Sequence, residues 1–295
     1  MTKKIYYKYR KFSERLLISL LKEEIFVAHP NTLNDPFEAM PSLQMDLSLR
    51  EAEKLLMKFD STDNDTKNLE KIEKLRQESH ELVDDEYNTD GLNSDEIYTL
   101  ILKNYIERKM RINETKGVFS VSEKYNCPLL WGHYGDEHKG ICIGYSIPEE
   151  YKENFWKVEY CDNREIKATD LIKKLDGDKE AARLITKKAL GTKSQEWGYE
   201  KEWRLIGAPE TVIKNIEIAE IIFGFRCEPV NVEIIVRLLQ GRRGAIKYFK
   251  MQLDKKSYGL EKEVFDPEEI TRYPPTSAQD TRDILSAFTP IDEAN

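Results

Sequence analysis

The stretch CPLLWGHYGDEHKGICIGY, residues 127–145, combines two patterns that rarely meet. Trp131, His133, Tyr134, Asp136 and His138 crowd into eight residues, and an apolar run, GICIGY, follows at once. The apolar run predicts a strand. Two of the four histidines lie directly before it, in a segment where loops are commonly recruited to binding or catalytic sites. We therefore expect a strand from about residue 140, preceded by a loop that borders a site.

The glycines of this stretch bear on its local structure. Gly132, Gly135 and Gly140 disfavour a regular helix, since each costs about 1 kcal/mol relative to alanine in a helix interior. His133 and His138 are separated by four residues and would need a helix to share one face. We therefore predict a loop here and no metal site.

Working outward, segments rich in β-branched and aromatic residues alternate with helical patterns. Ser13 is a plausible N-cap for a helix in which Leu16, Leu17, Leu20 and Leu21 form an apolar stripe. Strands are expected at 4–10, 25–30, 116–123, 154–162, 199–207, 217–226 and 244–254, and helices at 13–24, 167–190 and 229–239. This order predicts the α+β class, with a mixed, mostly antiparallel sheet as the core and helices inserted between strand clusters.

Residues 45–114 differ from the rest because they are highly charged and helical in period. Breaks near 60–65 and 88–96 predict two or three helices, forming either an insertion or lid, or an ordinary helical layer over a sheet. We predict one α+β domain over residues 1–262 that contains this insertion. Residues 263–295 are expected to form a loose tail with a short helix at TRDILSAF.

Composition narrows the function classes. The 295 residues carry a formal net charge of −8, which argues against a dedicated nucleic-acid binder. The four cysteines, Cys127, Cys142, Cys161 and Cys227, show no C-x-x-C spacing, so reduced thiols are expected. The chain has no apolar run long enough for a membrane helix, and its N-terminal segment lacks the apolar part of a signal peptide. We expect a cytoplasmic protein without membrane contact.

Two further stretches carry polar residues with chemical potential. In NDPFE, residues 34–38, a turn is one interpretation, and pairing of Asp35 or Glu38 with an arginine is the other. In YEKEWR, residues 199–204, a strand would place Glu200, Glu202 and Arg204 on one face. In a cleft, one carboxylate could then do electrostatic or acid–base work while the arginine holds it.

Taken together, four motifs resemble a large, mainly bacterial family known only as a domain of unknown function. The motifs are YKYR (7–10 with the preceding strand residues), NDPFE, FSVSE followed by LLWGHYGDEHKGICIGY, and WGYEKEWR. This resemblance implies a family and no activity. Roles in toxin or phage-defence settings are suggested by analogy alone.

A looser resemblance is to the ADP-ribosyltransferase fold, which implies NAD as substrate. It places Arg10 (or Tyr7) on an early strand, Ser122 on a middle strand and Glu202 (or Glu200) on a late strand. A fixed carboxylate there would stabilise the oxocarbenium charge that builds on the ribose as the nicotinamide bond breaks. Trp131 or Tyr134 would stack on a base. The early strand lacks the His-Gly-Thr or Arg-Gly step of that fold.

This second resemblance therefore implies an ADP-ribosyltransferase-like site with an unidentified protein or nucleic-acid acceptor. Its catalytic residues would be Glu202, Glu200, Arg10 and Ser122. Its substrate-binding residues would be Tyr7, Asn34, Asp35, Trp131, His133, Tyr134, His138, Trp197, Tyr199 and Arg204. We expect the 131–138 loop, NDPFE and YEKEWR to border one cleft.

Two alternatives stay open. One is a nuclease or other hydrolase in which Asp35, Glu38, Glu200, Glu202 and His133 hold Mg²⁺ or Mn²⁺. The other is a nucleotide-binding module without catalysis.

Overall fold

A computed structural model describes residues 4–35, 37–59, 65–84, 91–112, 115–242 and 246–271. The fold class is α+β with mixed, mostly antiparallel sheet strands, as predicted. The chain divides into two compact units, each assembled from segments distant in sequence. The first unit comprises residues 1–24, 124–146 and 215–295, and the second unit comprises residues 25–123 and 147–214. The expected TRDILSAF helix lies outside the described residues.

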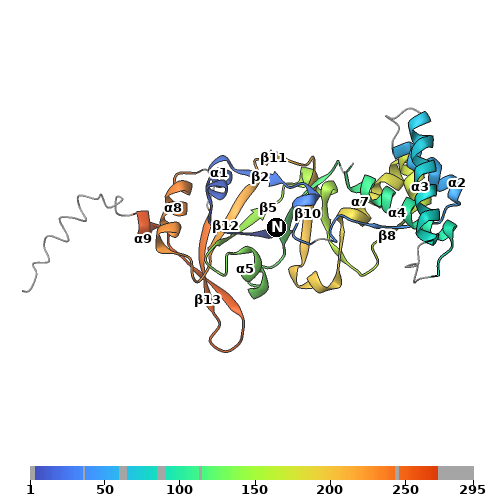
Figure 1. The fold of residues 1–295 in the computed structure, drawn as a ribbon. Helices are drawn as coiled ribbons and strands as arrows, with labels where there is room; N and C mark the ends of the chain where they lie inside the picture. Colours follow the sequence, from blue (N-terminus) through green and yellow to red (C-terminus); the bar gives the residue numbers. More distant parts are fainter. Residues whose placement is uncertain are drawn as a thin grey trace, which may run out of the picture. The chain divides into compact units, whose positions relative to one another are not determined.

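The first unit is built on strands in the order β14-β13-β12-β5-β1 (Figure 1). Neighbours pair antiparallel except β12 and β13, which run parallel and are joined through α8. The central strand β5 is buried along its whole length, as the apolar run GICIGY predicts. The elements are β1 (Ile5–Arg10), α1 (Glu14–Lys22), α5 (Pro128–Tyr134), β5 (Ile141–Ser146), β12 (Glu217–Phe223), α8 (Pro229–Leu239), β13 (Lys247–Leu253), β14 (Leu260–Val264) and α9 (Glu268–Thr271).

The second unit has β10 between β4 and β6, with both pairings antiparallel. Its remaining strands form three two-stranded pairs, β11-β2, β3-β8 and β7-β9. The strands are β2 (Glu24–Val27), β3 (Ser42–Gln44), β4 (Gly117–Ser122), β6 (Phe155–Lys157), β7 (Glu159–Tyr160), β8 (Glu165–Lys167), β9 (Thr192–Lys193), β10 (Glu202–Gly207) and β11 (Thr211–Lys214). The 3₁₀ segments are η1 (Pro30–Thr32), η2 (Glu149–Asn154) and η3 (Gln195–Glu200).

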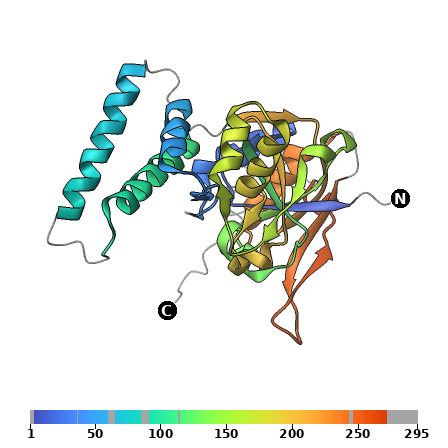
Figure 2. The same ribbon diagram turned by 90° about the vertical axis from the view of Figure 1, so that its right-hand side faces the viewer.

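The helices of the second unit include the charged block expected at 45–114. That block forms α2 (Leu49–Phe59), α3 (Asp65–Asp84) and α4 (Ser94–Ile112), which agrees with the prediction of two or three helices. Figures 1 and 2 show α3 and α4 lying side by side, and Ile72, Tyr98 and Leu102 are buried between α2, α3 and α4. Leu55 of α2 and Ile106 of α4 pack instead with residues of α6 (Ala168–Leu175) and α7 (Lys179–Leu190).

Two local predictions are wrong. Residues 128–134 form the short helix α5 and not a loop, because Pro128 occupies its first turn and Leu130 and Trp131 bury their side chains. Gly132 is tolerated inside it, since burial of a tryptophan outweighs a cost of about 1 kcal/mol. Residues 199–201 are not strand either, because η3 ends at Glu200 and β10 begins at Glu202.

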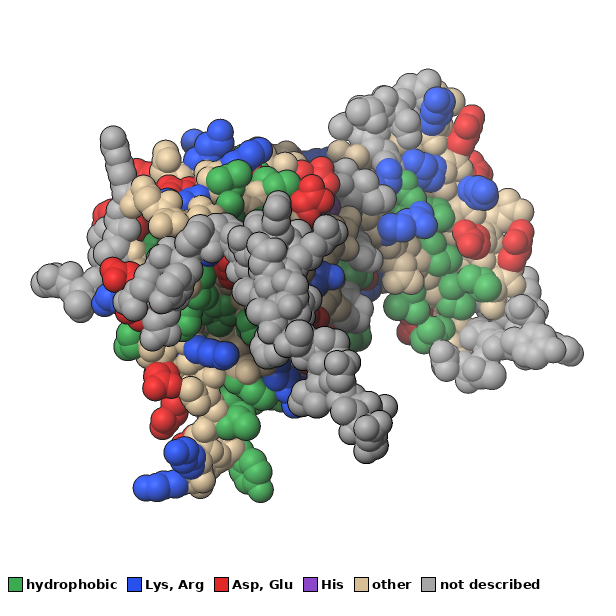
Figure 3. All heavy atoms as spheres, turned by 90° about the vertical axis from the view of Figure 1, so that its left-hand side faces the viewer, with side chains coloured by type: hydrophobic (Ala, Val, Ile, Leu, Met, Phe, Trp, Pro, Cys, Tyr) green, Lys and Arg blue, Asp and Glu red, His purple; other side chains and the backbone are tan. Residues whose placement is uncertain are grey.

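Two other predictions, the Ser13 cap and the reduced cysteines, are confirmed by the structure. Ser13 caps α1, where its Oγ accepts a hydrogen bond from Leu16 N at 3.3 Å. All four cysteines are free thiols. No helix in the described ranges is long and apolar enough to cross a membrane. On the face drawn in Figure 3, the described Lys and Arg side chains are interspersed with Asp and Glu, so neither sign of charge dominates that face.

The turn after α5 gives the first stability prediction. Gly224 N donates to Gly140 O at 2.9 Å and Arg226 N donates to His138 O at 3.1 Å, which brings these backbones together. A Cβ on Gly224 would lie 2.0 Å from His138 O, a backbone atom that cannot move freely. Gly224→Ala is therefore expected to lower the free energy of unfolding by about 1–3 kcal/mol.

Gly132→Ala is the matched control for that change. Apart from its chain neighbours and the backbone of its own helix, no atom lies within 4 Å of a Cβ at this position. The substitution is expected to leave stability unchanged or raise it by about 0.4–1 kcal/mol. Urea denaturation measures the free energy of unfolding of both variants. Equal changes for Gly224→Ala and Gly132→Ala would contradict the close contact between Gly224 and the His138 backbone.

Candidate functional site

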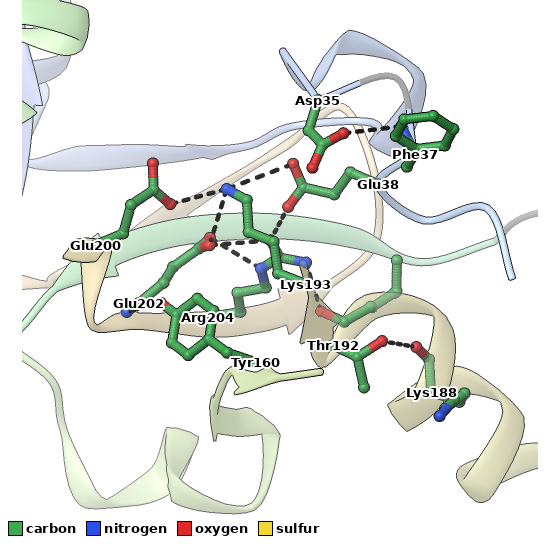
Figure 4. Close-up of polar contacts among 11 residues, drawn as sticks. Asp35, Phe37, Glu38, Tyr160, Lys188, Thr192, Lys193, Glu200, Glu202 and Arg204 are labelled. Atoms are coloured by element: carbon green, nitrogen blue, oxygen red, sulfur yellow. Dashed lines mark hydrogen bonds and ion pairs between the residues drawn. The ribbon is translucent and has the colours of Figure 1, made fainter. Parts of the chain in front are cut away.

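Five charged side chains are buried together in the second unit, as Figure 4 shows. They come from three separate parts of the chain: the loop after η1, strand β9, and the η3–β10 junction. The residues are Glu38, Lys193, Glu200, Glu202 and Arg204, and we call them the charge cluster. Buried charges are costly unless they are paired, so their mutual geometry decides what each of them can do.

Arg204 is the central cation and is fully buried. Its Nε donates to Glu202 Oε1 at 2.9 Å, its Nη2 donates to Glu202 Oε2 at 3.0 Å, and its Nη1 donates to Leu190 O at 2.7 Å. It also forms an ion pair with Glu38. Burial lowers the pKa of Arg204 to about 9, so the guanidinium remains charged at neutral pH. Glu202 is thus clamped in a two-point pair.

Lys193 is the second cation of the charge cluster. Its Nζ lies 2.8 Å from Glu200 Oε2, 3.4 Å from Glu202 Oε2 and 3.8 Å from Glu38 Oε2. The same Nζ lies 4.6 Å from the centre of the Trp197 ring, within range of a cation–π contact. Lys193 therefore links all three carboxylates.

The charge cluster is not neutral, because three carboxylates face two cations. The excess negative charge leaves one carboxylate oxygen unsatisfied. Glu38 Oε2 is shielded from solvent and has no hydrogen-bond partner. Lys193 Nζ lies 3.8 Å from this oxygen, which is an ion-pair distance beyond hydrogen-bond range. An unsatisfied buried carboxylate oxygen costs free energy, so this atom is suited to accept a hydrogen bond or positive charge from a ligand.

Glu200 lies at the end of η3, outside strand β10, yet its side chain lies beside that of Glu202 in the charge cluster. The conformation of the η3–β10 junction explains this placement. Lys201 adopts the left-handed conformation with φ 47°, which turns the chain between Glu200 and Glu202. Ser122 Oγ donates to Glu200 O at 2.5 Å, and Tyr160 Oη accepts from Glu202 N at 2.7 Å. Ser122 and Tyr160 therefore fix the positions of the two acids.

A cavity of about 240 Å³ adjoins the charge cluster within the second unit. Glu38, Lys193 and Asp35 line it, and Arg164 and Lys188 are two further cations in its wall. The remaining polar lining is Cys161, Asp162, Thr192 and Ser194. The cavity thus offers carboxylate acceptors beside lysine and arginine donors, a combination suited to hydroxyl groups and anionic groups of one small ligand.

Asp35, Phe37 and Glu38 of the NDPFE motif line one wall of this cavity. Asp35 is buried, and its Oδ1 accepts a hydrogen bond from Phe37 N at 2.9 Å. The Phe37 side chain is 64% exposed, with the Arg164 guanidinium 5.0 Å from its ring centre. The alternative in which Glu38 pairs with an arginine is confirmed by its ion pair with Arg204.

The predicted site residues are divided between the two units. The second unit contains Asn34, Asp35, Ser122, Trp197, Tyr199, Glu200, Glu202 and Arg204. The first unit contains Tyr7, Arg10, Trp131, His133, Tyr134 and His138. NDPFE and YEKEWR therefore meet through Glu38, Glu202 and Arg204, and the cavity described here uses residues of the second unit alone.

In the first unit, Trp131 belongs to the core. It is fully buried, its Nε1 donates to Tyr125 O at 2.8 Å, and its ring packs edge-on against Tyr9 and stacks on His138. Burial, and then the charge of Arg226, lower the pKa of His138, whose Nδ1 is buried without a hydrogen-bond partner. Tyr7 donates to Glu220 at 3.3 Å. These rings already contact one another.

Sequence reasoning missed Lys193, Tyr160 and Arg164, and it considered Glu38 only as a metal ligand or an arginine partner. A signal for Lys193 existed, since it precedes Glu200, Glu202 and Arg204 within twelve residues. For Glu38 and Arg164, the distance along the chain hid the contact. Among the described residues, no group of three or more His, Cys, Asp or Glu side chains is placed to hold a metal ion.

Comparison with known proteins gives one match. Residues 130–205 match the model of a family described as "Protein of unknown function (DUF2971)". This confirms the resemblance to a family of unknown function over a stretch that contains all but the first residue of LLWGHYGDEHKGICIGY and all of WGYEKEWR. The motifs YKYR, NDPFE and FSVSE lie outside it. No curated protein and no solved structure matches the chain.

Proposed function

We propose that the cavity beside Glu38 binds NAD and that the protein is an ADP-ribosyltransferase-like enzyme. The observation that carries this proposal is the unsatisfied Glu38 Oε2 in a buried cluster with one more carboxylate than cations. Such an oxygen is suited to a partner that brings a hydroxyl donor and develops positive charge. The ribose next to nicotinamide does both as its glycosidic bond breaks.

The proposed step is a displacement at the anomeric carbon. The bond from C1′ to the nicotinamide nitrogen breaks, and its electron pair leaves with neutral nicotinamide. A nucleophilic oxygen or nitrogen of the acceptor, or of water, forms the new bond to C1′ and releases its proton. Water would give ADP-ribose, nicotinamide and one proton. Fixed negative charge near the ribose favours the oxocarbenium-like transition state over the ground state.

In this proposal the three glutamates have different roles. Glu38 lines the cavity, and its Oε2 has no hydrogen-bond partner. Because this oxygen is shielded from solvent, the proposed contact with the ribose requires the Glu38 side chain to turn toward the cavity. Glu202 and Glu200 do not line the cavity, and their carboxylates are engaged by Arg204 and Lys193. In this proposal they are positioning residues that hold Lys193 and, through Arg204, Glu38.

Ser122 and Arg10 carry less weight in the proposal than the fold resemblance implies. Ser122 is buried, and its hydroxyl donates to the backbone of Glu200, which is a positioning contact. Arg10 belongs to the first unit. The proposal therefore rests on Glu38, Lys193 and the cavity that they line.

The second candidate is a nucleotide-binding module without catalysis. Arg204 donates to both oxygens of Glu202, and such a fixed ion pair could serve only to hold the walls of a binding cavity in place. The metal-dependent hydrolase stays a prediction. In this arrangement, three of the carboxylates named for it, Glu38, Glu200 and Glu202, contact Lys193 or Arg204.

The decisive experiment measures nicotinamide release from NAD with purified protein and cell lysate as the source of acceptor. Glu38→Gln keeps the size of the side chain and removes its charge, so release is expected to fall about 10²–10³-fold. Glu196→Gln, at an exposed position of η3 outside the cavity, is the control and is expected to retain full activity.

Binding distinguishes the two candidates. If NAD raises the melting temperature of the wild-type protein without nicotinamide release, the binding module replaces the enzyme. Wild-type release that is unaffected by Glu38→Gln would exclude the assigned role of this cavity. Thermal unfolding of Glu38→Gln distinguishes a loss of activity from a loss of fold.

A further inference from the structure

A second cavity, of about 280 Å³, lies in the second unit next to the one described above. Its lining is largely apolar and comes from helices α2, α4, α6 and α7 together with the segment after NDPFE. The apolar side chains include Met40, Phe59, Met110, Leu171, Leu175 and Ile185. The charged block at 45–114 thus supplies a cavity wall through α2 and α4. We call this space the apolar cavity and the one beside Glu38 the acidic cavity.

The two cavities share a wall. Ala39, Met40, Pro41, Arg164 and Ala189 line both of them. Each cavity alone is slightly smaller than the roughly 300 Å³ at which small-molecule sites usually begin, whereas the two together fall within the usual range. A ligand with two chemically different ends would fill both.

Arg164 stands at the boundary between the cavities and is held weakly. Its Nη1 donates to Met40 O at 3.1 Å and its guanidinium lies over the Phe37 ring. Among the described residues, no carboxylate forms an ion pair with Arg164, with Lys174 at the apolar cavity or with Lys188 at the acidic cavity. Three cations without acidic partners around two joined cavities are complementary to a ligand with negative charge near its middle.

We propose that the apolar cavity is the adenine subsite of a dinucleotide whose pyrophosphate is bound by Arg164. This inference rests on the proposed function for its orientation, because the reacting ribose must lie beside Glu38. The nicotinamide half then occupies the acidic cavity and the adenosine half the apolar one. The half-buried Phe59 ring and the apolar side chains provide the face on which a purine packs.

The test measures binding of two half-ligands, AMP and nicotinamide mononucleotide, by isothermal titration calorimetry with the full chain. Leu175 lines only the apolar cavity and is 37% exposed, so a larger ring fits there without overpacking the core. Leu175→Trp is expected to weaken AMP binding at least about 10-fold and to leave nicotinamide mononucleotide binding unchanged. Leu184→Trp, at a 54% exposed position of α7 outside both cavities, is the matched control and should bind both ligands normally.

Arg164→Ala provides the second arm. Loss of a charge-assisted contact to phosphate is expected to weaken both half-ligands about 10-fold, because Arg164 lines both cavities. The inference is overturned if the wild-type protein binds no AMP, or if Leu175→Trp and Leu184→Trp bind AMP equally.

These outcomes are separate from those of the proposed function. AMP binding that Leu175→Trp blocks would support the adenine subsite even if the protein released no nicotinamide. Conversely, nicotinamide release that depends on Glu38, with AMP binding insensitive to Leu175→Trp, would keep the enzyme and remove the adenine subsite.

Discussion

Replacement of Arg204 by methionine is expected to lower the free energy of unfolding by about 3–5 kcal/mol. The guanidinium is fully buried and pairs with both Glu202 and Glu38, while its third donor group binds Leu190 O. Methionine fills similar space without charge, so three buried carboxylates would remain with one lysine. The penalty comes from these uncompensated charges more than from lost packing.

Urea denaturation followed by circular dichroism measures this effect. Arg183→Met is the control, since Arg183 is an exposed arginine whose partner Glu180 is also exposed. Surface pairs contribute about 0–1 kcal/mol, so this change should be nearly silent. A loss below about 1 kcal/mol for Arg204→Met would contradict the buried ion-pair geometry.

A double variant separates charge from packing at the same site. Arg204→Met combined with Glu202→Leu removes one cation and the carboxylate that it clamps. Because a buried pair can be replaced by apolar residues at little cost, part of the lost stability should return. A double variant less stable than Arg204→Met alone would show that the charge imbalance is not the cause.

Trp131→Ala is expected to be the largest single destabilisation in the first unit, about 3–5 kcal/mol. Its ring is fully buried against Tyr9 and His138, and its Nε1 satisfies Tyr125 O. The change would leave a cavity and an unpaired carbonyl. Trp131→Phe keeps most of the packing and loses the hydrogen bond, so its cost should be smaller.

Leu129→Ala is the control on the same helix, because Leu129 is 51% exposed. Its effect should stay within about 1 kcal/mol, compared by urea denaturation with the effect of Trp131→Ala. Equal losses for the two alanine variants would show that Trp131 is not a core residue. In that case Trp131 would again be a candidate for binding a ligand.

The elements that could be predicted were those whose signals are local. The helical stripe with its Ser13 cap, the helical character of 45–114 and the apolar strand GICIGY all follow from periodicity and capping over a few residues. The pairing of Glu202 with Arg204 also follows from strand alternation. These features depend on neighbours in the chain and need no knowledge of distant segments.

Helix α5 was missed because tertiary burial outweighed local propensity. The glycines at 132 and 135 argue for a loop, yet burying Leu130 and Trp131 stabilises a short helix more than Gly132 destabilises it. The prediction that Glu200 lies on a strand is also wrong because a long-range contact outweighs the local pattern. The left-handed turn at Lys201 is stabilised by contacts such as the one from Ser122 to Glu200 O, which lies 78 residues away in sequence.

The amino-acid sequence alone determined the α+β class, most of the helices and strands, and the presence of an acidic pair beside an arginine. Only the tertiary structure decided that Glu38 and Lys193 complete the charge cluster, that one oxygen of Glu38 remains unsatisfied, and that Arg164 lies between two cavities. The physical reason is the distance along the chain over which the interactions act. Helix and strand patterns reflect interactions between near neighbours, whereas a buried charge is defined by whichever distant segments exclude water around it.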